Sequence, residues 1–308
     1  MRAAIAVVVM LLTGAHTARA QGPGADFVHG RDYTFERMEA TRSVNDEQDQ
    51  GTLRLVTYVY RPLKNDRREV VVFSIGSTGG MIRSPKEPGD GPAPAVIRFF
   101  VSRGYTLVVP QRRGRGESSG TYIEECSVIT GKCTIAEQLA LTERGLREAL
   151  LDTNAAIDQL VLGKLVPRDA KLLLAGQSRG GFLSLMLAGE RPSLVKGVIN
   201  FAGGWQSMQP SLSEADFKER LSLQAPRLAK AAKQFGGPSI WIYAVRDSFY
   251  RDDAPRLLLE AWRNAGGQAE YVAITEHSLV NAHLALTDAS LWGRQLAAFL
   301  ERTDKSKN

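Results

Sequence analysis

The sequence predicts a single α/β domain with a doubly wound, mostly parallel sheet and a small helical cap. Short apolar runs alternate with helical patterns from residue 70 to the end of the chain, as in successive βαβ units. Most of these runs are continuously apolar, which is typical of strands that are covered on both faces. No linker interrupts the alternation, and 308 residues are ample for one large core.

Seven runs rich in Val, Ile and Leu are predicted to be strands. The first alternates apolar and polar residues, and most of the others are continuous. They span residues 53–60, 70–75, 105–109, 171–175, 198–201, 240–244 and 270–274. The polar stretch 42–51, which precedes them, is expected to be an exposed loop.

Helical patterns fill most of the gaps between these strands and follow the last one. They span residues 93–102, 135–162, 181–188, 255–264 and 288–301. Residues 205–238, between two predicted strands, are more than a single crossover helix requires. We expect them to form a small helical cap over the C-terminal edge of the sheet.

The first twenty residues are typical of a secretory signal peptide. Arg2 precedes an apolar run over residues 3–12, and Ala18-Arg19-Ala20 fits the small-x-small cleavage rule. This run is shorter than the roughly 20 apolar residues of a membrane span, and no later run is long enough to be one. We therefore expect residues 21–308 to form a secreted or periplasmic domain; a buried N-terminal helix is the alternative.

Charge and cysteine content exclude two classes of partner. The basic residues are scattered and not interleaved with aromatic residues along one face, so no nucleic-acid partner is expected. Cys126 and Cys133 are the two cysteines, and because export places them in an oxidising compartment we expect them to form a disulfide that closes a surface loop, with free thiols as the alternative. Two thiols without a nearby His cannot supply the four ligands of a structural metal site.

Residues 172–185 read LLLAGQSRGGFLSL and contain the motif G-x-S-x-G around Ser178. A predicted strand lies directly before the motif and a predicted helix directly after it, which is the context of a nucleophilic serine. Such a tight turn holds the hydroxyl above the sheet edge, beside a helix N-terminus that favours negative charge. The alternative is a plain strand-to-helix turn.

A serine hydroxyl needs a base to remove its proton, and His is the usual one. The chain has four histidines. His16 lies in the predicted signal, and His29 lies ahead of the sheet. His277 and His283 both follow the last predicted strand. The residues alone do not decide whether His277 or His283 is the base.

An acid that orients the base is expected between Ser and His in the chain. Asp247 comes just after the predicted strand 240–244, at the edge where Ser178 also emerges. Asp252 and Asp253 stand near the start of a predicted helix and are expected to cap it.

An acyl-transfer site also needs amide donors for the oxyanion. One is expected to be the backbone N–H of Arg179, directly after the nucleophile. The other is expected in the glycine-rich segment SIGSTGG (residues 74–80), where the predicted strand 70–75 ends, at the N–H of Ser77, with Thr78 as the alternative.

The segment PQRRGRGESSG carries two further patterns. Its glycines loosely match a dinucleotide-binding fingerprint, but no helix opens on them to bind a pyrophosphate. Its basic residues either hold a substrate carboxylate or form an ion-pair network within the loop, and we favour the network. The residues concerned are Arg112, Arg113 and Arg115, beside Glu117.

Together, GQSRGG, WIYAVRDS, NAHLAL, LWGRQLAAFL and PQRRGRGESSG resemble the α/β-hydrolase superfamily, in its dienelactone-hydrolase-like and prolyl-oligopeptidase-like branch. The resemblance covers roughly residues 50–302. It implies a catalytic triad on Ser178, Asp247 and His283, and no metal or organic cofactor. Many relatives have His before the Gly of the oxyanion loop, where this chain has Ile75, and Gly where it has Ala282.

We expect an exported serine hydrolase, a carboxylesterase that cleaves small or medium esters through an acyl-enzyme on Ser178. A peptidase or aminopeptidase of the same fold is the second interpretation. A non-catalytic binding protein of the same fold is the third, and the presence of Ser, Asp and His in the order of the triad argues against it. The pockets that select an ester are shaped by loops, so the sequence does not identify the substrate.

Overall fold

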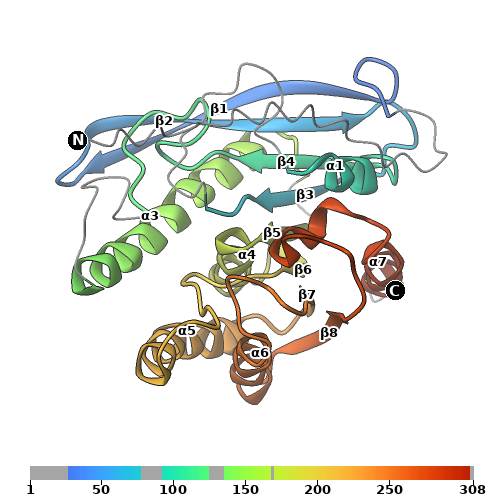
Figure 1. The fold of residues 1–308 in the computed structure, drawn as a ribbon. Helices are drawn as coiled ribbons and strands as arrows, with labels where there is room; N and C mark the ends of the chain where they lie inside the picture. The colour runs from blue at the N-terminus through green and yellow to red at the C-terminus, as the bar shows by residue number, and fades with distance from the viewer. Residues whose placement is uncertain (1–26, 78–91, 125–134, 168–169, 306–308) are drawn as a thin grey trace, which may run out of the picture.

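The structure is a computed structural model that describes residues 27–77, 92–124, 135–167 and 170–305 (Figure 1). The predicted signal, the predicted disulfide between Cys126 and Cys133, and the alternative oxyanion residue Thr78 lie outside the described residues. In the described part, no helix has both the length and the apolar character that a bilayer crossing needs.

Strands and helices alternate along most of the chain, as the sequence predicts. The strands are β1 (Tyr33–Asn45), β2 (Gln50–Pro62), β3 (Glu69–Ser74), β4 (Tyr105–Pro110), β5 (Leu172–Gln177), β6 (Val195–Phe201), β7 (Pro238–Ala244) and β8 (Gln268–Ile274). The helices are α1 (Pro94–Val101), α3 (Ile135–Leu162), α4 (Arg179–Glu190), α5 (Glu214–Gln234), α6 (Ala254–Asn264), the 3₁₀ helix η2 (Ala282–Thr287) and α7 (Gly293–Lys305).

The described strands form one sheet in the order β1-β2-β4-β3-β5-β6-β7-β8. β2 is antiparallel to β1 and β4, and the remaining neighbours are parallel. The prediction of a mostly parallel, doubly wound sheet is confirmed. Because β3, β5, β6, β7 and β8 run in one direction, the loops that follow them all leave from the same edge of the sheet.

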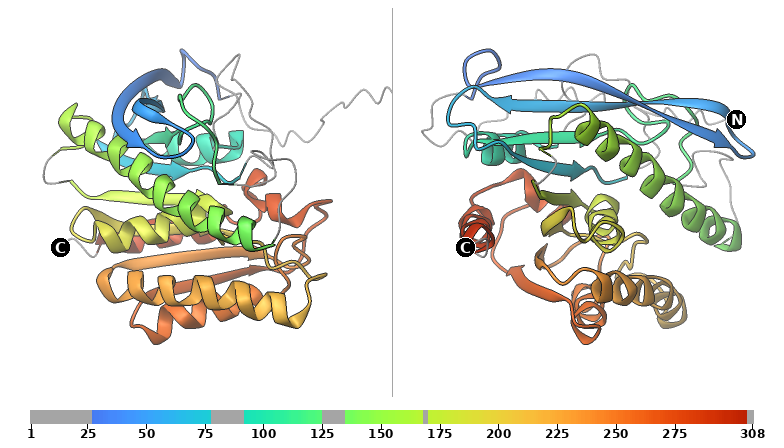
Figure 2. Two further views of the ribbon diagram at one scale, coloured as in Figure 1. Left: turned by 90° about the vertical axis from the view of Figure 1, so that its left-hand side faces the viewer. Right: turned by 180° about the vertical axis from the view of Figure 1, so that it is seen from behind.

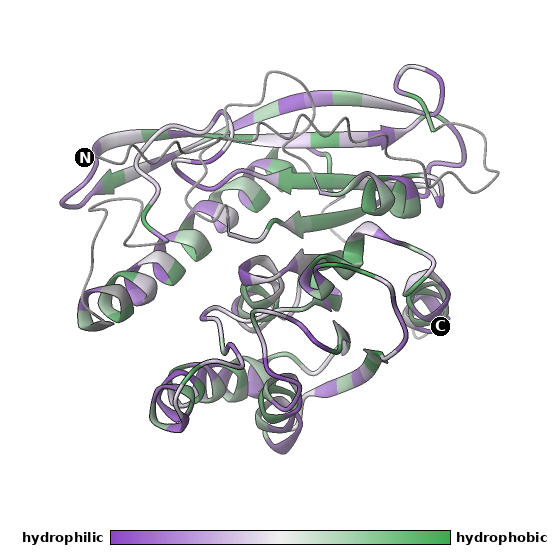
Figure 3. Ribbon diagram, viewed as in Figure 1, coloured by the Kyte–Doolittle hydropathy of each residue, from purple (hydrophilic) through white to green (hydrophobic). Residues whose placement is uncertain are grey.

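Helices cover both faces of this sheet (Figure 2). Buried side chains of α3, α4, α5 and α6 form one hydrophobic core with the strands, and those of α1, η2 and α7 form a second core on the opposite face. The central strands β3 and β4 are mostly apolar, whereas β1 and β8 are mixed (Figure 3). Burial on both faces explains the continuously apolar runs.

The expectation of an exposed loop over residues 42–51 is wrong. β1 continues to Asn45, β2 begins at Gln50, and only a short turn separates them. β1 is an edge strand with mostly half-buried or exposed side chains, so it lacks the apolar pattern of the inner strands. Cross-strand ion pairs between Arg61 and Glu36 and between Arg54 and Glu39 join it to β2 instead.

Residues 205–238 do not form the helical cap that we expected over the sheet edge. Most of them form α5, which packs against α4 and α6 in the helical layer on one face of the sheet (Figures 1 and 2). α5 is therefore the crossover helix between β6 and β7. The segment from Trp205 to Ser213, which precedes α5, accounts for the extra length.

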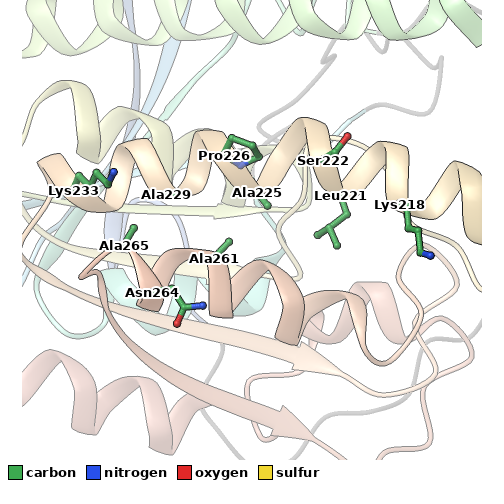
Figure 4. Close-up of a pocket in the computed structure, with 10 residues that line it drawn as sticks. All are labelled: Lys218, Leu221, Ser222, Ala225, Pro226, Ala229, Lys233, Ala261, Asn264 and Ala265. Carbon is green, nitrogen blue, oxygen red and sulfur yellow. The ribbon is translucent and has the colours of Figure 1, made fainter.

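α5 and α6 lie side by side and leave an open groove of about 580 Å³ between them (Figure 4). Small residues such as Ala225, Ala229 and Ala261 line it, with Lys218 and Lys233 among the other residues from the same two helices. None of the residues that the sequence identifies as catalytic lines this groove.

The last helix begins at Gly293 rather than at residue 288. The Asp288 carboxylate accepts hydrogen bonds from the backbone N–H (3.0 Å) and the hydroxyl (2.7 Å) of Ser290. Such local bonds compete with helical backbone bonds and favour a turn. The residues just before this turn form η2, which carries His283.

Replacing Gly189 by Ala should destabilise the fold. A Cβ atom at Gly189 in α4 would lie 2.7 Å from Ala231 Cα and 2.8 Å from Ala231 Cβ in α5, so the two helices would have to move apart. Overpacking of this kind costs about 1–3 kcal/mol. Urea denaturation followed by circular dichroism measures the loss.

Gly236→Ala is the matched control, because no atom lies within 4 Å of the added Cβ. We expect the free energy of unfolding of this variant to stay within about 1 kcal/mol of the parent value. Equal stability of the Gly189 and Gly236 variants would contradict the close α4–α5 contact.

Candidate functional site

Ser178 alone connects β5 to α4, at the C-terminal edge of the sheet. Its backbone is left-handed, with φ 56° and ψ −126°, a conformation that is strained for a residue with a side chain. Gly176 and Gly180 make this turn possible, because a Cβ at Gly180 would collide with the carbonyl of Ser74 and one at Gly176 with the carbonyl of Gly180. The small residues on both sides of Ser178 therefore allow the turn to pack directly on the end of β3.

The structure brings two of the predicted site residues into direct contact. His283 Nδ1 lies 2.8 Å from Asp247 Oδ2, and both side chains are buried. Asp247 follows β7, and its second oxygen accepts the backbone N–H of Phe249 at 2.7 Å. The carboxylate is therefore held on both sides, and it fixes which imidazole nitrogen carries the proton.

Two hydrogen bonds fix the backbone of the loop at His283. The N–H of His283 donates to Asn281 Oδ1 at 3.1 Å, and its carbonyl accepts from Gln177 Nε2 at 3.3 Å. Gln177 is the residue immediately before Ser178, so the His loop is tied to the serine turn itself.

His277 has a different environment. Its Nε2 lies 3.0 Å from the carbonyl oxygen of Val245, and its own carbonyl accepts from Arg246 Nη2 at 3.2 Å. These bonds join the loops after β7 and β8. The sequence left two histidines as candidate bases, and His283 is therefore the one whose ring binds Asp247.

Asp252 and Asp253 do not take the place of Asp247 beside His283. Asp252 accepts the backbone N–H of Arg246, and Asp253, at the N-cap position of α6, pairs with Arg251. The expectation that these two carboxylates cap the helix is wrong, because Asp253 occupies the N-cap position without a side-chain cap hydrogen bond and Asp252 binds Arg246 instead.

Tyr250 is a site residue that the sequence did not reveal. Its hydroxyl donates to the carbonyl of Gly204 at 2.9 Å, and its ring centroid lies 5.7 Å from that of His283. Burial and the Asp247 carboxylate raise the pKa of the phenol, while Arg179 and the nearby Ser178 hydroxyl oppose the rise. The neutral phenol therefore lies beside the serine, the aspartate and the histidine together.

Ser178 and His283 are not directly hydrogen-bonded in the described part of the chain. Bonds between a nucleophile and its base are often long in unliganded enzymes and shorten when a substrate binds. The Phe249 ring, whose centroid is 4.6 Å from that of His283, is partly exposed and flanks the imidazole.

The segment after β3 runs beside Ser178. A Cβ at Gly76 would collide with Gln177 Oε1 and lie 3.1 Å from Ser178 Cβ, so any larger residue would force the Gln177 side chain and the serine turn to shift. Ser77 follows immediately and is exposed. Arg179 is the first residue of α4, and its N–H belongs to the helical turn that has no acceptor within the helix.

Arg112 and Arg115 form the predicted ion-pair network, but with Glu124 rather than Glu117. Arg112 donates to Glu124 through Nε at 2.5 Å and Nη2 at 2.9 Å, and Arg115 Nη1 lies 3.5 Å from the same carboxylate. Burial alone would raise the pKa of Glu124, but the two guanidinium charges outweigh it and lower the pKa to about 2. Glu117 pairs with Arg37 on β1.

Arg113, between these two arginines in sequence, belongs to a separate network. It pairs with Asp46 in the β1–β2 turn at 2.6 Å, and its backbone N–H donates to Asp152 of α3 at 2.8 Å. Arg42 of β1 joins the same group through Asp152 and Glu148. This network fastens the β1–β2 hairpin to α3.

In the described ranges, no group of three or more His, Cys, Asp or Glu side chains is arranged to hold a metal ion. The segment PQRRGRGESSG, whose glycines loosely match a dinucleotide-binding fingerprint, forms a turn in which Gly114, Gly116 and Gly120 have positive φ.

Solved structures share this architecture at low sequence identity. An esterase from Pyrococcus furiosus has a TM-score of 0.57 at 13% identity, over 88% of this chain and 90% of the esterase. An acylaminoacyl peptidase from Pyrococcus horikoshii has a TM-score of 0.57 at 16% identity, over 89% of this chain but only 42% of the peptidase. Est1E from Butyrivibrio proteoclasticus has a TM-score of 0.55 at 12% identity, over 87% and 99%. No protein-family model and no curated protein matches the chain.

The chemistry of the site predicts which residues control the reactivity of Ser178. Asp247→Asn and His283→Ala should each slow the reaction of Ser178 with a fluorophosphonate by about a hundredfold or more, because the hydroxyl loses its oriented base. His277→Ala should leave the rate within about tenfold of the parent, because its ring binds a backbone carbonyl instead. Intact-mass spectrometry over time gives the rates. A slow His277 variant together with a fast His283 variant would reverse the assignment.

Proposed function

We propose that this chain, which has the α/β-hydrolase fold, is a serine hydrolase whose nucleophile is Ser178. The observation that carries the proposal is the buried Asp247–His283 pair beside a serine on a strained turn. Strain of this kind is retained where the surrounding structure fixes it, and such positions cluster at active sites.

The reaction follows from these positions. Ser178 Oγ attacks the substrate carbonyl while His283 Nε2 takes its proton, and Asp247 holds the proton on Nδ1 and stabilises the imidazolium that forms. The backbone N–H groups of Arg179 and Ser77 bind the oxyanion of the tetrahedral intermediate. His283 then gives the proton to the leaving group, and a water molecule that it activates releases the acyl group from Ser178.

Carboxylic esters are the substrate class that we favour. This chain spans 90% of the P. furiosus esterase and 99% of Est1E, but only 42% of the acylaminoacyl peptidase. The match to two esterases over nearly the whole length of each supports carboxylic esters, and we propose small or medium ones. A peptidase or aminopeptidase activity is the second candidate, because the peptidases share the same fold over their matching part.

A panel of chromogenic esters of rising acyl length, measured beside amino-acyl anilides, tests the substrate class. We expect ester hydrolysis that Ser178→Ala lowers by several orders of magnitude, with unchanged circular dichroism, because the hydroxyl forms the acyl-enzyme. Turnover of the anilides but not of the esters would favour the peptidase. Equal hydrolysis by the parent and by Ser178→Ala would remove Ser178 as the nucleophile.

We also propose that the protein is exported and acts in a periplasmic or extracellular compartment. The basic residue, the apolar run and the Ala-Arg-Ala site within residues 1–20 support this. Expression of the full chain in a bacterium, followed by intact-mass analysis of the periplasmic fraction, should give a protein that begins at Gln21. A cytoplasmic product that retains residues 1–20 would contradict the proposal.

A further inference from the structure

The carbonyl of Gly76 and the N–H of Ser77 belong to the same peptide unit. A trans peptide is planar, and its C=O and N–H point in opposite directions. No cis peptide is present in the described residues. Any group that holds the Gly76 carbonyl therefore also sets the direction of the Ser77 N–H.

Arg115 holds that carbonyl. Its Nη2 donates a hydrogen bond to Gly76 O. Arg112 Nη1 donates to the carbonyl of the preceding residue, Ile75, at 3.1 Å. β3 ends at Ser74, so these two peptides lie beyond the strand and are held by guanidinium groups instead of the backbone bonds of the sheet.

Both guanidinium groups are themselves rigidly placed. The side chains of Arg112 and Arg115 are 1% and 2% exposed, and both contact the buried Glu124 carboxylate. Burial, reinforced by the charge of Arg112, lowers the pKa of Arg115 to about 10, so Arg115 remains charged at neutral pH. A charged donor to a carbonyl makes a stronger hydrogen bond than a neutral one.

Glu124 also connects this network to the other side of the serine turn. Its backbone carbonyl accepts a hydrogen bond from Arg179 Nη1 at 2.7 Å, and Arg179 Nε donates to the carbonyl of Trp205 at 3.0 Å. One residue therefore links the segment after β3 to the first residue of α4.

We infer that Arg115, supported by Arg112 and Glu124, is a positioning residue that orients the Ser77 N–H as an oxyanion donor. This inference rests on the proposed serine-hydrolase function. Arg115 contacts the far end of the peptide and not the substrate, so it acts through the backbone. Donors that are already aligned need no reorganisation when the oxyanion forms, which is the source of their catalytic effect.

The test compares Arg115→Met with the parent enzyme. Methionine is apolar and of similar length, and it leaves Glu124 paired with Arg112. We expect kcat to fall by about a hundredfold while KM stays within about threefold, because loss of one oxyanion donor has an effect of that size on the transition state alone. Affinity for a trifluoromethyl ketone, whose adduct with Ser178 carries an oxyanion, should fall by a similar factor. Affinity for the corresponding methyl ketone should not change.

Arg113→Met is the matched control. Arg113 is as buried as Arg115 and lies two residues away, but it pairs with Asp46 and not with the segment after β3. We expect a lower melting temperature for this variant and a kcat within about threefold of the parent, because the change affects stability and not the oxyanion site.

Arg115→Lys keeps the inference testable if Arg115→Met does not fold. Lysine retains the charge and can still donate to a carbonyl, but it lacks the planar fork, so kcat should fall by about tenfold at constant KM. If both Arg115 variants keep a kcat within about threefold of the Arg113 control, the inference is wrong. If the protein is not a serine hydrolase, the result is different, because the parent protein would then neither hydrolyse esters nor form the ketone adduct.

Discussion

The packing of the Ser178 turn onto the end of β3 is the constraint on which the rest of the site depends. Because Gly180 contacts the carbonyl of Ser74 and Gly76 passes beside Ser178, the proposed nucleophile and the segment after β3 pack as one unit. The left-handed backbone of Ser178 costs free energy, which burial of the surrounding strands and helices offsets. A larger side chain at these glycines would separate the parts that must act together.

Three loops from the same sheet edge meet at this turn, and each is fastened by polar contacts. Gln177 binds the backbone of the His283 loop, Tyr250 of the Asp247 loop binds Gly204, and the arginines around Glu124 bind the segment after β3. Loops are usually the most variable parts of a domain, and these contacts hold them close to a rigid core. The geometry of the proposed catalytic site therefore depends on these loop contacts as much as on the sheet.

Part of this arrangement was predictable from local pattern. The inner strands and the long helix α3 could be identified because burial on both faces leaves a continuous apolar signal and a helix leaves a periodic one. β1 was not predicted, because at this edge of the sheet ion pairs with β2 take the place of an apolar pattern. The crossover helix within residues 205–238 was predicted as a cap, because crossover and cap helices have similar amphipathic sequences. They differ only in the surface that they cover.

The sequence by itself determined the fold class and the position of Ser178, because a strand, a glycine-flanked serine and a helix are a local pattern that fixes a local turn. It also limited the candidate base to His277 or His283 and indicated Asp247 as the candidate acid. Only the tertiary structure decided that His283 binds Asp247, that Tyr250 lies beside Ser178 and that Glu124 pairs with Arg112 and Arg115. These contacts join segments that are far apart in the chain, and no local preference encodes which loop residues meet after the sheet has formed.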